Sequence, residues 1–189
     1  MALSERFEQA FLYASNLHRN QKRKGSSTPY LAHLLGAASL VLEDGGSEDE
    51  AIAALLHDAP EDQGGLEVLE EIRRRFGEQV AMIVDGCTDS YENPKPPWRL
   101  RKESFLERLA ESAQGVQRVA LADKVHNARS LLADLRRSGE KVWARFNGGK
   151  EGTLWYYRSL VEVYRGLPPT AMFASFEETV LKIEALADR

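Results

Sequence analysis

The sequence predicts an all-α fold of about eight to ten helices, and three observations favour it. Apolar residues recur at helical spacing along nearly the whole chain, alternating strand patterns are scarce, and capping residues separate the helical stretches. The chain has 189 residues, which predicts one domain covering 1–189. We found no internal repeat and no low-complexity tract to set against this organisation.

The first helix is expected to follow Ser4. Phe7, Phe11, Ala14 and His18 fall on one helical face, and the Ser4 hydroxyl can cap the helix that carries them. A polar, basic loop should follow this helix and lead to the next apolar stretch.

A second helix is predicted for 31–43, because two glycines follow it and stop the pattern. Ser47 and Glu50 form a capping-box pattern that opens a third helix over 48–57. Pro60 is expected to end that helix, since the residue before a proline disfavours the α conformation.

The remaining helices follow from the same periodicity. They are predicted at 66–75, 78–87, 99–112, 116–135, 140–144, 153–165 and 176–187. The proline-rich stretch 90–98 and the glycine-rich stretch 146–152 are predicted loops. Ser175 with Glu178 is predicted to cap the last helix.

Composition excludes several classes of function. Twenty-five Lys and Arg against 29 Asp and Glu give a net charge of −4, which argues against a dedicated nucleic-acid binder. Cys87 is the only cysteine, so neither an internal disulfide nor a thiolate metal cluster is available, and a reducing cytoplasm is expected. No stretch resembles a signal peptide or approaches the roughly 18 apolar residues of a membrane span. The oligomeric state is left open.

Two carboxylates stand in apolar surroundings. His57 and Asp58 follow the apolar run 53–56. Asp123 stands among the apolar residues Val119, Ala120, Leu121, Ala122 and Val125. A buried carboxylate is costly unless it is paired or bound to a metal. The alternatives are a His57–Asp58 pair that closes a helix end, and a local salt bridge from Asp123 to Arg118 or Lys124.

A third fragment adds His33 at the start of an apolar helix, where a histidine can also be an ordinary hydrogen-bonded core residue. Together, His33, His57, Asp58 and Asp123 offer two imidazoles and two carboxylates from three helices. Such mixed N/O donors without sulfur suit a catalytic Mn, Fe, Zn or Mg ion. A water held by such an ion becomes a nucleophile near neutral pH.

Two further groups of residues suit phosphate chemistry. Glu61 and Asp62 follow the turn at Pro60 and are candidates for proton transfer, although such a pair can also cap a helix or stay solvated. Basic residues gather at 18–24 and at 99–102, and Lys124 adjoins a proposed ligand. They can grip phosphate or simply form a solvated basic face.

These pieces, in this order and spacing, resemble the hydrolase domain of the Rel/SpoT family of alarmone enzymes, and most of all its small stand-alone (p)ppGpp hydrolases. The matching stretches are 18–24 (HRNQKRK), 28–33 (TPYLAH), 53–62 (AALLHDAPED), 76–88 (FGEQVAMIVDGCT) and 121–131 (LADKVHNARSL). They span about two thirds of the chain.

The resemblance implies an all-α HD-domain fold and one divalent metal ion, typically Mn²⁺. The metal ligands that it implies are His33, His57, Asp58 and Asp123, and the catalytic acidic pair is Glu61 and Asp62. The implied nucleotide contacts are Arg23, Lys24, Asn127 and Tyr156. Lys124 is a further candidate contact because its charge adjoins a proposed metal ligand.

The chain departs from the family around the substrate pocket. Leu34 replaces a proline, the loop 25–28 is unusual in length, Pro60 replaces a β-branched residue, and 136–152 matches no family segment. The chain also ends before the family's synthetase domain would begin.

Three functions remain open. The first is metal-dependent hydrolysis of guanosine 3′-diphosphate 5′-di(tri)phosphate to GDP or GTP and pyrophosphate. The second is an HD phosphohydrolase that acts on a nucleoside monophosphate or a 2′-phosphorylated dinucleotide. The third is a non-catalytic nucleotide-binding module. The expected partner in every case is a small phosphorylated nucleotide, rather than a nucleic-acid polymer or a membrane.

Overall fold

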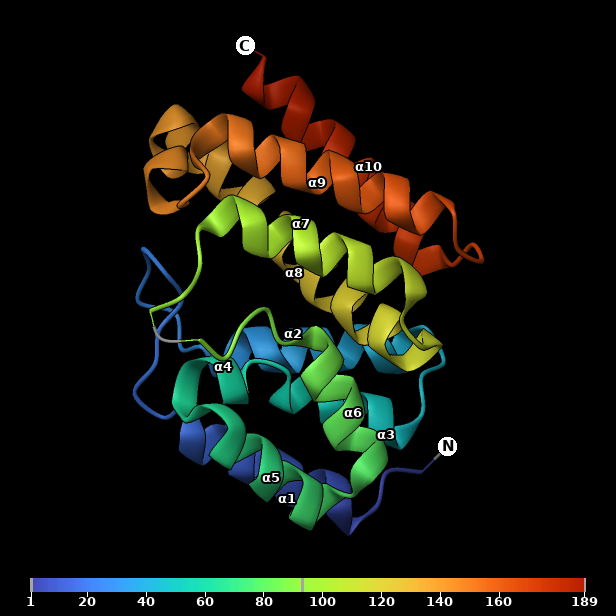
Figure 1. Cartoon of the computed structure of the whole chain (residues 1–189). Helices are drawn as coiled ribbons and strands as arrows, with labels where there is room; N and C mark the ends of the chain where they lie inside the picture. The colour runs from blue at the N-terminus through green and yellow to red at the C-terminus, as the bar shows by residue number, and fades with distance from the viewer. Residues whose placement is uncertain (1, 93, 189) are drawn as a thin grey trace.

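The computed structural model describes residues 2–92 and 94–188, and within these ranges the chain is helical (Figure 1). Ten α-helices and one 3₁₀ helix are present there. They confirm the all-α fold class, although the short helix over 59–63 was not predicted. The described residues show no strand beyond one isolated β-bridge, which joins Lys22 to Pro29. This bridge closes the basic loop that precedes α2.

The first six helices are α1 (Glu5–Leu17), α2 (Leu31–Glu43), α3 (Glu48–Leu56), α4 (Ala59–Gln63), α5 (Gly65–Phe76) and α6 (Glu78–Cys87). They are followed by α7 (Trp98–Glu111), α8 (Gln114–Ser138), the 3₁₀ helix η1 (Gly139–Arg145), α9 (Gly149–Arg165) and α10 (Ala171–Ala187).

The predicted caps at the start of the chain are confirmed. The Ser4 hydroxyl accepts a hydrogen bond from the backbone N–H of Arg6 and begins α1. Ser47 and Glu50 form a complete capping box at the start of α3, with the Ser47 hydroxyl and the Glu50 carboxylate each accepting from the other's backbone. These local signals place both helices where the sequence predicts them.

Three predicted boundaries are wrong. Pro60 does not end α3, which stops at Leu56; it lies in the first turn of α4, where the missing N–H has no helical partner to lose. Thr170 rather than Ser175 caps α10, so the helix begins at Ala171. The stretch 146–152 is only partly a loop, because α9 begins at Gly149.

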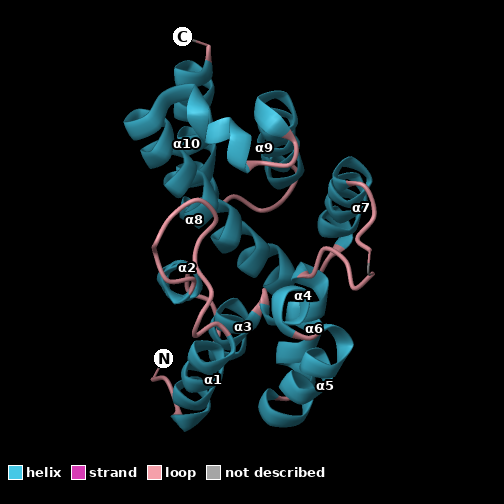
Figure 2. Ribbon diagram, turned by 90° about the vertical axis from the view of Figure 1, so that its left-hand side faces the viewer, coloured by secondary structure: helices cyan, strands magenta, loops and turns pink. Residues whose placement is uncertain are grey.

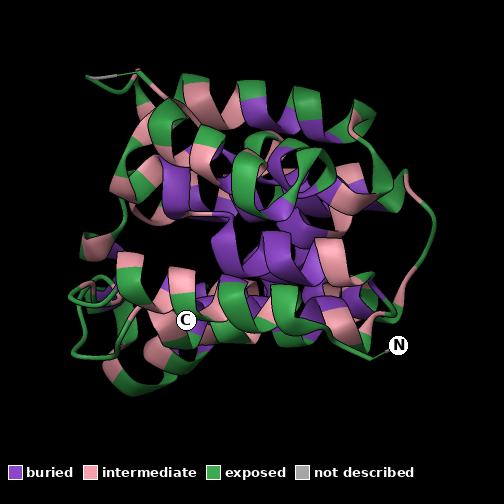
Figure 3. Ribbon diagram, turned by 90° about the horizontal axis from the view of Figure 1, so that it is seen from below, coloured by how far each residue is buried: buried purple, intermediate pink, exposed green. Residues whose placement is uncertain are grey.

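Helix α8 is the axis of the fold. It packs against α2, α3 and α6 on one side and against α10 on another (Figures 1 and 2). Val119, Ala122, Val125 and Ala128 of α8 are fully buried. Seen from below, the buried residues concentrate in the middle of the molecule, where these helices meet (Figure 3). Burial of this apolar surface is the main stabilising term.

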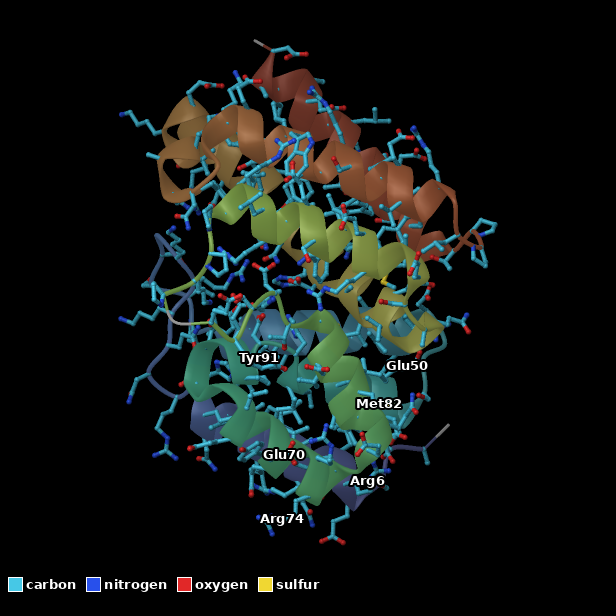
Figure 4. The ribbon with its side chains drawn as sticks, viewed as in Figure 1. Arg6, Glu50, Glu70, Arg74, Met82 and Tyr91 are labelled. Atoms are coloured by element: carbon cyan, nitrogen blue, oxygen red, sulfur yellow. The ribbon has the colours of Figure 1, made fainter. Side chains whose placement is uncertain are left out.

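A buried ion-pair network fixes α8 relative to α2 and α3. The guanidinium of Arg118 donates to Asp44 at the end of α2 (3.1 Å) and to Glu50 on α3 (2.6 Å). Glu50 is buried on α3, at mid-height in Figure 4, whereas Arg6, Glu70 and Arg74 lie toward the lower end of the view, on α1 and α5. Because Arg118 lies on the same helix as Asp123, the network also sets the position of Asp123 opposite α2 and α3.

Among the described residues, no helix combines the length and the apolar character needed to cross a bilayer.

Candidate metal centre and adjoining cavities

Side chains from three separate segments converge beside α8. His33 comes from the first turn of α2, and His57 and Asp58 lie between α3 and α4. One donor atom from each of these three residues lies within 4.8 Å of the other two. The Nε2 atom of His57 is 3.0 Å from Oδ2 of Asp58, and the Nε2 atom of His33 is 3.5 Å from the same oxygen.

Asp123 completes the cluster from α8. Its Oδ1 atom lies 3.2 Å from Nε2 of His33 and 3.8 Å from Nε2 of His57. The four residues that the sequence singles out as metal-ligand candidates therefore face one another, with their N and O donors at the centre.

The hydrogen bonding of the two histidines fits a metal ion. Both Nε2 atoms are buried and have no hydrogen-bond partner. The Nδ1 atom of His57 lies 2.8 Å from the carbonyl oxygen of Ala54, which can only accept, so Nδ1 carries a proton and Nε2 is the nitrogen that faces Asp58 and can bind a cation. Metal-bound histidines in proteins are oriented in this way.

The electrostatics of the cluster favour a cation. Burial raises the pKa of Asp58, but the charge of protonated His57 and the hydrogen bonds from His33 and His57 outweigh it and hold that pKa well below its usual range. Burial lowers the pKa of His57, but Asp58 and Asp123 outweigh it and raise that pKa well above its usual value, so a proton occupies the place that a metal ion would take. Burial acts on Asp123 in the same direction, and Lys124 together with His33 lowers the pKa of that carboxyl. Both carboxyl groups are thus charged at neutral pH and attract a positive charge between them.

Asp123 also forms a local salt bridge, which the sequence offered as the alternative to metal binding. Its Oδ2 atom lies 2.5 Å from Nζ of Lys124. Asn127 donates to the other oxygen, Oδ1, from one turn along α8. The salt bridge uses Oδ2, while Oδ1 faces the histidines. The other alternative partner, Arg118, is bound to Asp44 and Glu50 instead.

Two residues that sequence reasoning missed support the cluster. The Tyr30 hydroxyl donates to Oδ2 of Asp58 at 2.6 Å. His126 meets His33, with the two Nδ1 atoms 2.9 Å apart. Burial and the neighbouring His33 lower the pKa of His126 to about 4, so this imidazole is neutral at physiological pH. Both residues lie inside the recognised motifs, but spacing alone gives no sign of these contacts.

Glu61 and Asp62 lie on α4, one turn beyond Asp58. Lys95 donates to Oε1 of Glu61 at 2.6 Å, and the Gln21 side-chain amide donates to Oδ2 of Asp62 at 2.7 Å. Partial burial and the charge of Asp58 raise the pKa of Asp62. The pair therefore lies beside the cluster, as the sequence predicts, and each carboxylate is held by a partner from another segment.

Two cavities adjoin the cluster. The smaller has a volume of about 210 Å³ and is lined by Asp58, Glu61, Asp62 and Asp123, among others. The larger, of about 810 Å³, has His33 in its wall. Four residues line both cavities: Tyr30, Lys102, Lys124 and Asn127. The larger volume is in the range of small-molecule sites.

The nucleotide-contact candidates line the larger cavity. Arg23 reaches across from the basic loop and donates to Oδ1 of Asn127 at 2.5 Å. Lys24 points toward Asn147, and Tyr156 is buried in the wall with its hydroxyl unpaired. The basic loop therefore contacts residues that are more than 100 positions away along the chain, and together they form the wall of the larger cavity.

The three basic residues of the second cluster, at 99–102, have different surroundings. Arg101 and Lys102 both bind the buried carboxylate of Asp89, and Lys102 also faces the cavities. Arg99 instead lies over the ring of Trp155, with its Cζ atom 3.2 Å from the ring centroid. Only Lys102 of the three lines the cavities, and Asp89, which sequence reasoning missed, is the residue that orients it.

The cavity also shows what the unmatched segment 136–152 contributes. Arg137, Arg145, Phe146 and Asn147 line the larger cavity, and none of them lines the smaller cavity beside Asp58 and Asp123. Trp98 lies in the same wall, and a Cβ atom at Gly148 would lie 2.7 Å from its ring. This segment therefore forms cavity wall rather than an unrelated surface loop.

Comparison with known proteins matches these features. Residues 10–154 match the HD domain family. The guanosine-3′,5′-bis(diphosphate) 3′-pyrophosphohydrolase MESH1 of Xenopus tropicalis is 35% identical over 161 residues, which are 84% of this chain and 82% of the relative. The human MESH1 protein is 34% identical over the same shares of each chain.

A solved structure described as a metazoan ortholog of SpoT that hydrolyses ppGpp superposes with a TM-score of 0.78. It is 25% identical in sequence, and the match covers 96% of this chain and 97% of that chain. The resemblance that the motifs indicate is therefore confirmed over nearly the whole fold. This chain belongs to the HD-domain family, and within it to the family of the guanosine-3′,5′-bis(diphosphate) 3′-pyrophosphohydrolases.

Proposed function

We propose that this chain, acting as one catalytic domain over 1–189, hydrolyses guanosine 3′-diphosphate 5′-di(tri)phosphate to GDP or GTP and pyrophosphate. The observation that carries the proposal is the position of Glu61 and Asp62. They line a cavity with Asp58 and Asp123, and that cavity shares four lining residues with a larger basic one. A binding module has no need of this acidic pair. The identity of the proposed substrate comes from the names of the relatives given above.

The proposed metal is Mn²⁺, with His33, His57, Asp58 and Asp123 as its ligands. The two unpartnered Nε2 atoms and the two charged carboxylates support this assignment. When bound, such an ion supplies Lewis-acid activation of water and of the phosphoryl group.

The chain's own residues then supply proton transfer and charge. Water oxygen attacks the phosphorus that is attached to O3′ of the ribose, and the O3′–P bond breaks. Glu61 or Asp62 accepts the proton of the attacking water, and a proton returns to O3′ as GDP or GTP leaves. Lys102 and Lys124, which face both cavities, balance the charge that develops on the phosphoryl oxygens.

We assign the rest of the nucleotide to the larger cavity. Arg23 and Lys24 supply cationic contacts from the basic loop, Asn127 supplies a polar contact to the ribose, and Tyr156 supplies an aromatic surface. A compact polyanion suits this arrangement, whereas the net charge of −4 opposes a long nucleic-acid chain. We also propose a cytoplasmic location, with which the single unpaired Cys87 is consistent.

The test is incubation of the purified protein with Mn²⁺ and ppGpp, with phosphate and pyrophosphate release measured separately. We expect GDP and pyrophosphate in equal amounts, and no release by Asp123→Ala. Survival of ppGpp while a nucleoside monophosphate or a 2′-phosphorylated dinucleotide is consumed would replace this substrate with the second one. Failure to consume any of them would favour the binding module.

A further inference from the structure

His18 is a buried imidazole outside the proposed metal set. It is 2% exposed, at the end of α1, and its ring stacks on that of Tyr30 with centroids 5.2 Å apart. Its Nδ1 atom lies 2.7 Å from Oε1 of Gln21, while its Nε2 atom is buried without a partner. Burial of Nε2 without a hydrogen-bond partner costs free energy that an apolar ring at this position would not lose. The hydrogen bond of Nδ1 is therefore the one advantage of a histidine here.

His18, Gln21 and Asp62 form a row of hydrogen bonds, and the carboxylate of Asp62 determines which group donates in each of them. The Asp62 carboxylate accepts from its partner, so the Gln21 amide must present its Nε2 atom to it, as the 2.7 Å contact shows. The Oε1 atom of Gln21 then faces His18 and accepts a second hydrogen bond from Gln63 at 2.5 Å. The Gln63 amide nitrogen also lies 3.4 Å from Nδ1 of His18, but its shorter contact is the one with Gln21 Oε1. Because Oε1 can only accept, the 2.7 Å contact places a proton on Nδ1 of His18.

We propose that His18 is a positioning residue, which acts through Gln21 to hold the Asp62 carboxylate in the orientation needed for proton transfer. This inference rests on the proposed function, because Asp62 matters only if it takes part in the reaction. The donor at Nδ1 fixes the Gln21 amide, the amide fixes one oxygen of Asp62, and the other oxygen is left for water. Two hydrogen bonds to Gln21 Oε1 prevent the amide from turning its oxygen toward the carboxylate.

The stacked ring of Tyr30 offers a competing explanation. The Tyr30 hydroxyl donates to Asp58, so His18 could matter only as a flat support beneath Tyr30. Two substitutions separate the explanations. His18→Phe keeps a ring on Tyr30 and removes the donor, whereas His18→Asn places an amide N–H near the position of Nδ1 and removes the ring.

We expect His18→Phe to lower kcat by roughly 10- to 100-fold, the scale of a misplaced catalytic group, with KM and Mn²⁺ affinity unchanged. His18→Asn should recover most of the lost kcat. Gln21→Ala, which leaves the core intact, should reproduce the loss if either His18 variant folds poorly. The reverse ranking, with Phe active and Asn inactive, would overturn the proposal in favour of the support role.

A double-mutant comparison tests whether the loss of kcat in His18→Phe acts through Asp62. In an Asp62→Asn background, His18→Phe should produce no further loss of kcat, because the group that it positions is already gone. Additive losses would show that His18 acts on something other than Asp62. If wild-type protein fails to cleave ppGpp but cleaves another nucleotide, only the proposed substrate fails, and the same comparison is made on that nucleotide.

One measurement needs no activity. The imidazole ¹⁵N resonances of metal-free protein should show His18 protonated at Nδ1 and unprotonated at Nε2. The reverse tautomer would break the chain to Asp62 and overturn the proposal, whatever the protein hydrolyses. An Nδ1-protonated His18 that shifts on Gln21→Ala would support it.

Discussion

The Nδ1 atoms of His33 and His126 lie 2.9 Å apart, so one must donate and the other accept. His126 is neutral, since burial and His33 lower its pKa to about 4. If His33 donates from Nδ1, its Nε2 atom carries a lone pair toward Asp123 and Asp58. If His126 donated instead, the proton of His33 would lie on Nε2 and block a cation. The tautomer of His33 that can bind a metal ion is therefore the one in which His126 accepts from Nδ1 of His33.

Removing this pair should weaken metal binding without emptying the site. We expect His126→Ala to lower Mn²⁺ affinity by about 10- to 100-fold, the usual effect of losing a group that orients a ligand. Titration calorimetry of the metal-free protein measures it directly. His126→Asn, which keeps a polar atom near the Nδ1 position, should lose less. Equal affinity in wild type and His126→Ala would mean that His33 needs no partner.

The close approach of His126 depends on Gly36 of α2. A Cβ atom at Gly36 would overlap the ring of His126, whereas the helical backbone itself accepts alanine. We expect Gly36→Ala to displace the ring and to weaken Mn²⁺ binding, despite the better helix propensity of alanine.

The matched control for Gly36 is the same substitution in a His126→Ala background. With the ring gone, Gly36→Ala should raise the free energy of unfolding by up to about 1 kcal/mol, as helix propensity predicts. Denaturant unfolding of the four proteins completes the cycle. Loss of stability in that background would identify a clash with some other group.

Metal binding should stabilise the fold, because it compensates two charged carboxylates in a largely buried site. At a Mn²⁺ concentration about 100 times Kd, the gain in unfolding free energy should be about 2.7 kcal/mol, seen as a rise in Tm that EDTA reverses. Asp123→Ala should abolish the rise. Asp49→Asn, which alters a carboxylate paired with Arg6 on the outer side of the fold, should keep it. A Tm rise retained in Asp123→Ala would remove Asp123 from the metal set.

The acidic pair should affect turnover rather than metal binding. We expect Glu61→Gln and Asp62→Asn each to lower kcat by about 10²-fold or more, the scale of a lost acid–base group, with Mn²⁺ affinity within a few-fold of wild type. Glu67→Gln, at an exposed position on α5, serves as the control. If kcat is unchanged in both variants, Glu61 and Asp62 do not take part in catalysis. Their role is then structural, through their hydrogen bonds with Lys95 and Gln21.

The metal-ligand candidates could be predicted because their chemistry conflicts with their surroundings. Asp123 stands on the buried face of an amphipathic helix and Asp58 follows an apolar helix. Burying either carboxylate requires compensation that the local sequence supplies only in part. That conflict is visible without any structure. The convergence of the three segments is not, since it depends on how α8 packs against α2 and α3.

Residues that act through tertiary contacts were not predictable in the same way. Nothing in the spacing of Tyr30, Gln21 or Asp89 indicates which carboxylate or ammonium each will meet, because their partners lie 13 to 41 positions away along the chain. The start of α10 was predicted wrongly because Thr170 and Ser175 are both good N-cap residues. The burial of Met172 accompanies the earlier start, and it depends on tertiary packing that the local sequence does not show.

Trp98 should contribute to substrate affinity rather than to chemistry. Its half-buried ring lines the larger cavity, but not the smaller cavity that Asp58 and Asp123 line, and it meets Tyr156 edge-on, with centroids 6.2 Å apart. Stacking of an aromatic side chain on a nucleobase is worth about 1–3 kcal/mol. Because the base does not react, we expect Trp98→Ala to raise KM by about tenfold or more while kcat stays within twofold of wild type. Trp98→Phe should restore most of the affinity, and nucleotide should quench tryptophan fluorescence in wild type more than in either variant. A fall in kcat with unchanged KM would place Trp98 next to the reacting phosphate instead.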